Sequence, residues 1–226
     1  IINCPRAGAS RGTSLDDAME QVLFFEHNLK TTRSVRRNLD FDRPIEQADL
    51  YACIDVAVQA PTGLIGEGWR FLVVTEAAKK AAIAALYCET LTTLMAERGL
   101  PLKSSHQALM DRLHDIPCMI LVCAVGEPPE EIGGQIGFYG SILPAAWSLM
   151  LALRGRGIGT TWTSLLNARA ADVARLLGIP EGITQTVMLP AAYTKNATLK
   201  PAARAPAAAV TFWESWGNNR FDAPEP

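Results

Sequence analysis

The stretch from Ile136 to Leu153 constrains the fold of this 226-residue chain most strongly, because it contains no charged residue. Its length is near the lower limit for a helix that spans a membrane. It also contains Gly137, Gly140 and Pro144, so we interpret it as a helix buried inside protein on all sides. A chain of this size has few places to bury such a helix. The stretch therefore predicts a homodimer whose interface supplies the missing cover.

Apolar runs elsewhere in the chain predict the strands of a central sheet. The run from Phe71 to Val74 is continuous, which is typical of a strand buried on both faces. Three further apolar runs are interpreted as strands as well. The predicted strands are Trp69–Thr75, Pro117–Val125, Ile158–Ser164 and Ile183–Tyr193.

Helical patterns lie between these runs, and the first of them follows a capping-type sequence at Ser14 to Asp17. The interleaved helices and strands predict an α+β domain in which helices cover a central sheet. The predicted helices are Leu15–Lys30, Ile45–Gln59, Glu76–Gly99, Ser104–Asp115 and Ala168–Leu177. The first helix is expected to bury its apolar residues, which are Met19, Val22, Leu23 and either Phe24 or Phe25.

The chain shows no internal repeat and no linker that would divide it. We expect residues 1–13 to form a flexible N-terminal arm and residues 14–226 to form a single domain. From about residue 194 the sequence is rich in Pro and Ala and predicts an extended C-terminal arm. This arm carries Trp213 and Trp216, which are expected to pack on another surface such as the partner subunit.

The overall charge and the cysteines limit the classes of partner and compartment. A net charge of −2 and a pI near 6.0 give no reason to expect a nucleic-acid partner. The five cysteines are scattered without metal-binding spacing, which predicts reduced thiols and no metal site. Residues 1–10 lack the apolar segment of a signal peptide. We therefore expect a cytoplasmic protein that does not associate with membranes.

A small basic cluster at Arg33, Ser34 and Arg36 is the first candidate binding site. Two guanidinium groups and a hydroxyl can supply short charge-assisted hydrogen bonds to a phosphate. Lys200 and Arg204 lie in the charge-poor tail, where lone basic residues are usually solvated. From the residues alone, a solvated basic turn at the end of a helix is the favoured interpretation.

The turn at Pro61, Thr62 and Gly63 is the second candidate site. Pro61 forces the preceding residue out of the helical region, and Gly63 permits a positive φ. Thr62 offers a hydroxyl and backbone groups to a ligand. The alternative is an ordinary connection between a helix and a strand.

Taken in order, several short runs resemble the FMN-dependent nitroreductase family. They cover most of the chain, from about Asp17 to about Trp216. The runs are Thr31-Thr32-Arg33-Ser34-Val35-Arg36, Ala60-Pro61-Thr62-Gly63, Gly68-Trp69-Arg70-Phe71, the segment 157–165, Leu189-Pro190-Ala191-Ala192-Tyr193, and Lys200 to Pro206. The resemblance implies a homodimer with a central mixed sheet.

The same resemblance implies that the protein binds FMN. Arg33, Ser34 and Arg36, together with Lys200 and Arg204, would then hold its phosphate. Pro61, Thr62 and Gly63 would reach the flavin across the dimer. Backbone groups of Thr163, Ser164 and Leu165 would approach the reactive edge of the ring.

The sequence departs from the family pattern just after the Pro61 turn. Typical members carry an Asn where Ile65 stands and a Gln where Glu67 stands, after a Ser or Thr in place of Leu64. We therefore assign Leu64, Ile65 and Glu67 to substrate binding and expect the substrate range to differ. Glu67 is expected to lower the flavin potential and to repel anionic acceptors; alternatively, it points to solvent or pairs with Arg70.

The resemblance implies that NAD(P)H reduces the FMN by hydride transfer, and that a nitroaromatic, quinone or similar flat acceptor is then reduced by two electrons in a ping-pong cycle. No protein side chain stands out as catalytic, which suits a flavoenzyme because the cofactor carries the redox chemistry. His27, His106 and His114 are interpreted as exposed or structurally satisfied. The alternatives are another flavin enzyme on the same fold, of the dehalogenase, ene-reductase or flavin-destructase type, and a non-enzymatic flavin-binding or sequestering protein.

Overall fold

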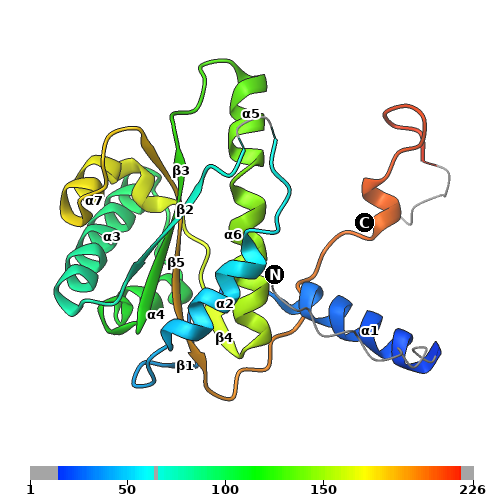
Figure 1. The fold of residues 1–226 in the computed structure, drawn as a ribbon, viewed down its shortest axis with the longest axis horizontal. Helices are drawn as coiled ribbons and strands as arrows, with labels where there is room; N and C mark the ends of the chain where they lie inside the picture. The colour runs from blue at the N-terminus through cyan, green and yellow to red at the C-terminus, as the bar shows by residue number, and fades with distance from the viewer. Residues whose placement is uncertain (1–14, 64–65, 220–226) are drawn as a thin grey trace, which may run out of the picture.

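The computed structural model describes residues 15–63 and 66–219 and is built around one five-stranded sheet (Figure 1). Four strands follow the order β1–β5–β3–β2, and β4 pairs with β5. The predicted N-terminal arm, the capping residue Ser14 and the candidate residues Leu64 and Ile65 lie outside the described residues. The strands are β1 (Leu39–Asp40), β2 (Trp69–Val74), β3 (Cys118–Val125), β4 (Ile158–Thr160) and β5 (Ile183–Thr194).

Helices cover both faces of the sheet, and the α+β class is confirmed. One face carries α2 (Gln47–Ala57), α5 (Ile132–Gly140) and α6 (Leu143–Gly155). The opposite face carries α3 (Ala77–Glu97), α4 (Ser104–Met110) and α7 (Ala170–Leu177). Each named ladder among the described strands is antiparallel, where a mixed sheet was expected, and one isolated parallel bridge joins Gly126 to Ile183.

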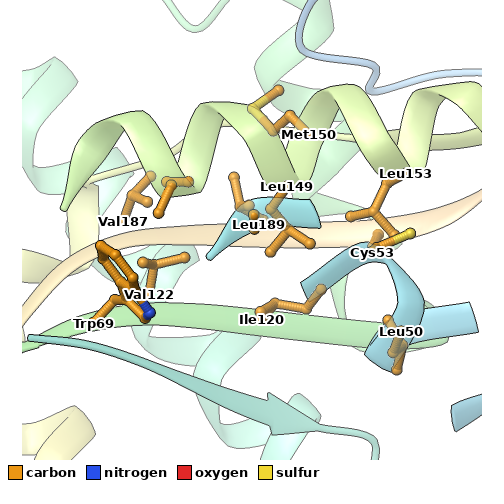
Figure 2. Packing of buried hydrophobic residues seen from close by; sticks show 14 of the residues in the cluster. Leu50, Cys53, Trp69, Ile120, Val122, Leu149, Met150, Leu153, Val187 and Leu189 are labelled. Carbon is orange, nitrogen blue, oxygen red and sulfur yellow. The ribbon is translucent and has the colours of Figure 1, made fainter. Parts of the chain in front are cut away.

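The main core lies between α6 and the sheet, as Figure 2 shows. Leu149 and Leu153 are fully buried; Leu149 points toward Leu189 of β5, and Leu153 lies beside Cys53. Helix α2 packs beside α6 and adds Cys53 to this layer. The face of α6 that meets the sheet is thus buried by apolar contact.

The uncharged stretch forms two helices and not one. Pro144 occupies the first turn of α6 and has no N–H to donate to the carbonyl of Gly140, so a continuous helix would lose a hydrogen bond there. By its length and its apolar composition alone, the segment Ile132–Gly155 could cross a membrane. In this fold the segment is interrupted at Ser141 and packs on α2 and the sheet.

Several predicted boundaries differ from the structure. The strand predicted over Ile158–Ser164 ends at Thr160, because the chain leaves the ladder and returns only for a single bridge between Thr163 and Met188. The helix predicted over Ser104–Asp115 ends at Met110 and is followed by a short 3-10 turn, Leu113–Asp115. Strand β2 is only half-buried at Phe71, Leu72 and Val73, since it forms an edge of the described sheet.

Helix α1 (Leu15–Thr31) has the predicted position, but the prediction that it buries its apolar face in this chain is wrong. The helix extends away from the sheet beside the C-terminal arm (Figure 1). The apolar side chains are between 51% and 68% exposed; they are Met19, Val22, Leu23, Phe24 and Phe25. An apolar patch of this size is typical of a surface that meets another protein.

The four described cysteines, Cys53, Cys88, Cys118 and Cys123, are free. Cys118 and Cys123 point to opposite faces of β3, as their spacing predicts, and lie in different core clusters. Burial raises the pKa of the Cys118 thiol to about 12 and that of the Cys123 thiol to about 11. These two thiols are therefore structural groups and not nucleophiles.

Candidate functional site

The basic segment at residues 33–36 is fixed to β4 and the residues that follow it. The Val35 N–H donates to the Thr160 carbonyl at 2.8 Å, and the Thr161 hydroxyl donates to the Val35 carbonyl at 2.8 Å. Gly159 permits this approach, because a Cβ there would lie 3.1 Å from the Val35 Cβ and 2.9 Å from a Thr194 methyl. These contacts hold the basic segment in a fixed position against β4.

Ser34 contributes to this attachment through its side chain. The Trp162 N–H donates to the Ser34 hydroxyl oxygen at 3.0 Å. The hydroxyl proton is still available for a ligand, since a hydroxyl can accept and donate at once. Ser34 therefore has a structural contact in addition to its predicted role toward a phosphate.

Arg33 and Arg204 are brought together although they are far apart in the sequence. They line a hollow of about 390 Å³ with Thr32 and Pro201. The Arg33 Nη1 donates to the Lys200 carbonyl at 2.8 Å, which ties the C-terminal arm to the basic segment. Lys200 takes part through its backbone, and both arginine side chains are exposed at the rim. The hollow has the charge and the donors of an anion site.

Arg36 does not join that hollow and lies near α3 and α4. Its guanidinium is close enough to Tyr87 on α3 and to His106 on α4 to influence the pKa of both. Burial raises the pKa of Tyr87, while a hydrogen bond with the Thr163 side chain and the charge of Arg36 act in the opposite direction. The Arg36 Nε is buried and has no hydrogen-bond partner among the described residues. A buried donor without a partner is unusual and calls for a ligand or water.

The residues after β4 lie between these two regions. Thr163 pairs with Met188 of β5 through both of its backbone groups. The Leu165 N–H turns back to the Thr163 hydroxyl at 3.3 Å, and Ser164 is exposed between them. The predicted residues Thr163, Ser164 and Leu165 are therefore held in a fixed turn next to Tyr87.

The turn at Pro61 to Gly63 is exposed and rests on the junction of α5 and α6. The Gly63 N–H donates to the Ser141 hydroxyl oxygen at 3.0 Å, and that hydroxyl donates to the Gly137 carbonyl at 2.8 Å. The turn thus presents Thr62 outward from the helical face. Glu67 is exposed as well; its carbonyl accepts a hydrogen bond from Arg70, and its carboxylate forms no ion pair with any described residue.

A shallow cavity of about 620 Å³ lies next to the basic segment on the α6 side. Arg33 and Ser34 form one edge of this cavity, and Gly140 lies at another. The remaining wall is mainly apolar and aromatic, with Tyr139, Trp147 and Trp162. Tyr87, Tyr139 and Trp147 were not assigned to the site from sequence, because an aromatic residue in a helix resembles any core residue, whereas Trp162 lies in the segment 157–165 that resembles the family.

Among residues 15–63 and 66–219 no cluster of side chains could hold a metal ion. His27 is exposed, and His114 is exposed beside Asp115 at 3.3 Å, as the sequence interpretation expected. His106 differs from them, because it is half-buried and its Nδ1 has no hydrogen-bond partner among the described residues.

The model of the nitroreductase family matches residues 29–193, which include the basic segment, the Pro61 turn and the turn after β4. The chain belongs to the nitroreductase family. This finding confirms the resemblance inferred from the short runs. A search of curated protein sequences gives no match.

Solved structures of the family share the fold at low sequence identity. A nitroreductase-like protein from Bacillus cereus has a TM-score of 0.64 and 22% identity, over 84% of this chain and 96% of that one. An iodotyrosine deiodinase bound to FMN and 3-iodo-L-tyrosine has a TM-score of 0.63 and 23% identity, over 82% and 98%. An NADPH:FMN oxidoreductase from Vibrio harveyi in complex with NAD+ has a TM-score of 0.64 and 15% identity, over 84% and 76%. These likenesses establish the nitroreductase fold.

The contact between Ser34 and Trp162 generates a prediction about stability. Ser34→Ala leaves the Trp162 N–H without its partner and should lower the free energy of unfolding by about 1–2 kcal/mol. Urea unfolding of the flavin-free protein measures this loss. Ser104→Ala, at an exposed serine whose side chain forms no hydrogen bond with a described residue, is the matched control. Equal free energies of unfolding for the two variants would show that the hydrogen bond between Ser34 and Trp162 does not stabilise the fold.

Proposed function

We propose that this protein is an FMN-dependent oxidoreductase in which NAD(P)H reduces the flavin and a flat acceptor then receives two electrons. The observation that carries the proposal is the convergence of Arg33 and Arg204 on one hollow, in a chain whose family match spans the same segment. The neighbours with FMN and with NAD+ support it.

The hollow suits the phosphate end of FMN. A phosphate monoester carries between one and two negative charges at neutral pH. Arg33 and Arg204 can each donate a charge-assisted hydrogen bond to it, and such bonds contribute about 1.5–3 kcal/mol. The hydrogen bond from the Arg33 side chain to the Lys200 carbonyl already holds the C-terminal arm in place, so less of the arm has to become ordered when FMN binds.

Arg36 and the turn after β4 suit the ring end of the same ligand. FMN supplies hydride-transfer chemistry when bound. The buried Nε of Arg36 and the guanidinium around it offer donors to a carbonyl oxygen. Thr163, Ser164 and Leu165 present backbone groups from a turn held by Met188 and Tyr87. In this proposal the protein orients the ring, and NAD(P)H and the acceptor bind next to it one after the other.

The exposed surfaces support a homodimer with two shared sites. The apolar side chains of α1 are exposed to solvent, and Trp216 in the C-terminal arm is 92% exposed. The exposed Pro61–Gly63 turn would contribute Thr62 to the flavin of the partner subunit. A partner that covers these surfaces would bury apolar area, which drives association. A flavin-loaded protein that stays monomeric would contradict this part of the proposal.

The acceptor in this proposal is a nitroaromatic, a quinone or a similar flat molecule. The aromatic cavity beside Arg33 suits such a molecule by shape and polarity. The FMN-bound deiodinase keeps a reductive dehalogenase as the second candidate. The free thiols of the described residues fit a cytoplasmic protein.

The test of the proposed function is anaerobic reduction of the bound flavin. The wild-type protein should retain FMN, lose its yellow colour with NADH or NADPH, and regain it with a quinone or nitroaromatic. Arg204→Ala should weaken FMN about tenfold or more while leaving riboflavin affinity nearly unchanged, because riboflavin lacks the phosphate. Arg98→Ala, at an exposed arginine away from the hollow, is the control.

Two outcomes of that test would reject parts of the proposal. Equal affinity for FMN and riboflavin in the wild type would reject the phosphate hollow. Bound FMN that neither nicotinamide reduces would indicate a flavin-binding protein without this activity. Faster reoxidation by an iodinated phenol than by a quinone would favour the dehalogenase alternative.

Glu67 generates a second prediction about the acceptor. Its unpaired carboxylate should repel anionic acceptors, although its exposure allows salt to screen much of the effect. Glu67→Gln should raise the ratio of kcat/KM for a nitrobenzoate over a neutral nitroaromatic by about twofold or more at low salt. It should also raise the flavin potential. Glu127→Gln is the matched control, and an unchanged ratio and potential would show that Glu67 only shapes its turn.

A further inference from the structure

A further cavity, of about 350 Å³, lies on the face of the sheet that carries α3, α4 and α7 (Figure 1). Strand β2 lines one side of it, and the segment that follows α7 lines the other. It shares no lining residue with the hollow at Arg33 and Arg204 or with the aromatic cavity beside Arg33. The proposed flavin chemistry therefore does not use this cavity.

Side chains of β2 and β3 form the floor of the cavity. Arg70 pairs with Cys123 in the antiparallel ladder between the two strands, so both side chains lie on one face of the sheet. Leu72 is two residues further along β2 and lies on the same face. Phe71 alternates with them and packs against the core on the α6 side. Apart from Arg70 at the rim, the floor is thus an alkyl chain and a thiol.

The segment after α7 forms the opposite wall. Gly178 ends the helix with a φ of 68°, a left-handed conformation that lets the chain turn back toward β5. The Ile179 N–H donates to the Ala174 carbonyl at 3.0 Å, which fixes this turn. The apolar residues of the wall are Leu177, Ile179, Pro180 and Ile183.

The far end of this wall is tied to the end of β3. The Gly126 N–H donates to the Gly182 carbonyl at 2.6 Å, and the Thr184 hydroxyl donates to the Gly126 carbonyl at 2.7 Å. Hydrogen bonds therefore hold the connection between α7 and β5 at both of its ends. The cavity is formed before any ligand binds, which is usual for small-molecule sites.

Arg70 is the one charged residue among the described residues that line the cavity. Its Nη1 donates to the carbonyls of Glu67 and Trp69 at 3.2 and 2.7 Å, which holds the guanidinium at the rim. None of the ion pairs between described residues includes Arg70. Glu181, in the loop after α7, does not line the cavity. The other N–H groups of Arg70 can therefore donate to an anion.

We propose that this cavity binds a small aliphatic carboxylate, with its hydrocarbon chain against the aliphatic walls and its carboxylate on Arg70. A guanidinium matches both oxygens of a carboxylate, which explains the preference for this head group. An apolar cavity of about 150 Å³ can hold benzene, so this larger one has room for a chain of about eight carbon atoms. The site does not depend on the proposed flavin function.

The experiment titrates the full-length protein, in the presence of excess FMN, with octanoate and separately with octan-1-ol. The two probes share their chain length and differ in charge, and calorimetry measures both affinities. Arg70→Gln should weaken octanoate about threefold to fivefold at low salt, because an exposed arginine contributes about as much as a surface ion pair. It should leave octan-1-ol unchanged. Arg98→Gln, at an exposed arginine that does not line the cavity, is the control.

A second variant tests the position of the chain. Ile179→Trp, at a half-buried residue of the wall, should fill the cavity and weaken both probes about tenfold or more, because burial of the chain provides most of the affinity. Leu100→Trp, at a leucine that is 53% exposed, is its control. The affinity for FMN should be the same in all four variants.

Three results would overturn the proposal. The first is a wild-type protein that does not bind octanoate. The second is unchanged octanoate affinity in a folded Ile179→Trp, which would place the chain on another apolar surface. The third is unchanged octanoate affinity in Arg70→Gln, which also decides the case if Ile179→Trp does not fold. Failure of the proposed function would appear separately, as a wild-type protein that binds octanoate and does not bind FMN.

Discussion

The attachment of the basic segment to β4 and to the residues after it determines where the arginines of the candidate site lie. Three hydrogen bonds hold residues 34 and 35 against residues 160–162, and Gly159 allows the two backbones to approach closely. Because the segment is fixed, Arg33 faces the C-terminal arm while Arg36 faces α3 and α4. In the proposed function these two arginines, three residues apart, bind opposite ends of FMN, and a mobile segment could not hold them in that arrangement.

The fold could be predicted from sequence where a regular pattern identifies an element. Strands β2 and β3 lie within one residue of their predicted bounds, because continuous apolar runs mark strands, although β2 lies at the sheet edge and is only half-buried. The position of α1 could be predicted too, but its exposure could not. An amphipathic pattern shows that a helix has an apolar face and does not show which chain covers it. We predicted one continuous helix through Pro144, whereas the structure has a break just before it. Proline is favoured in the first turn of a helix, so its position was a signal for a new helix start.

The site was harder to predict than the fold, because sequence spacing does not tell which side chains share a hollow. The structure brings Arg33 together with Arg204 and separates both from Arg36. The second contact of Ser34, to the Trp162 backbone, has no sequence signature. Tyr87 lies on a helix that looks like ordinary cover for the sheet, and only its hydrogen bond with the Thr163 side chain places it beside the turn after β4. The resemblance to the nitroreductase family selected the segments, and the three-dimensional structure decides which of their atoms face one another.

The central claim is that each flavin site combines the arginines of one subunit with the Pro61–Gly63 turn of its partner. The most direct measurement counts the FMN bound by mixed dimers of two defective chains. One chain carries Arg33→Ala and Arg204→Ala, and the other carries Thr62→Asp, with different affinity tags. Each variant alone should bind little FMN, whereas the mixed dimer has one site with both halves intact and should bind one FMN per two chains. A mixed dimer that binds none, while both variants remain folded, would contradict the shared site.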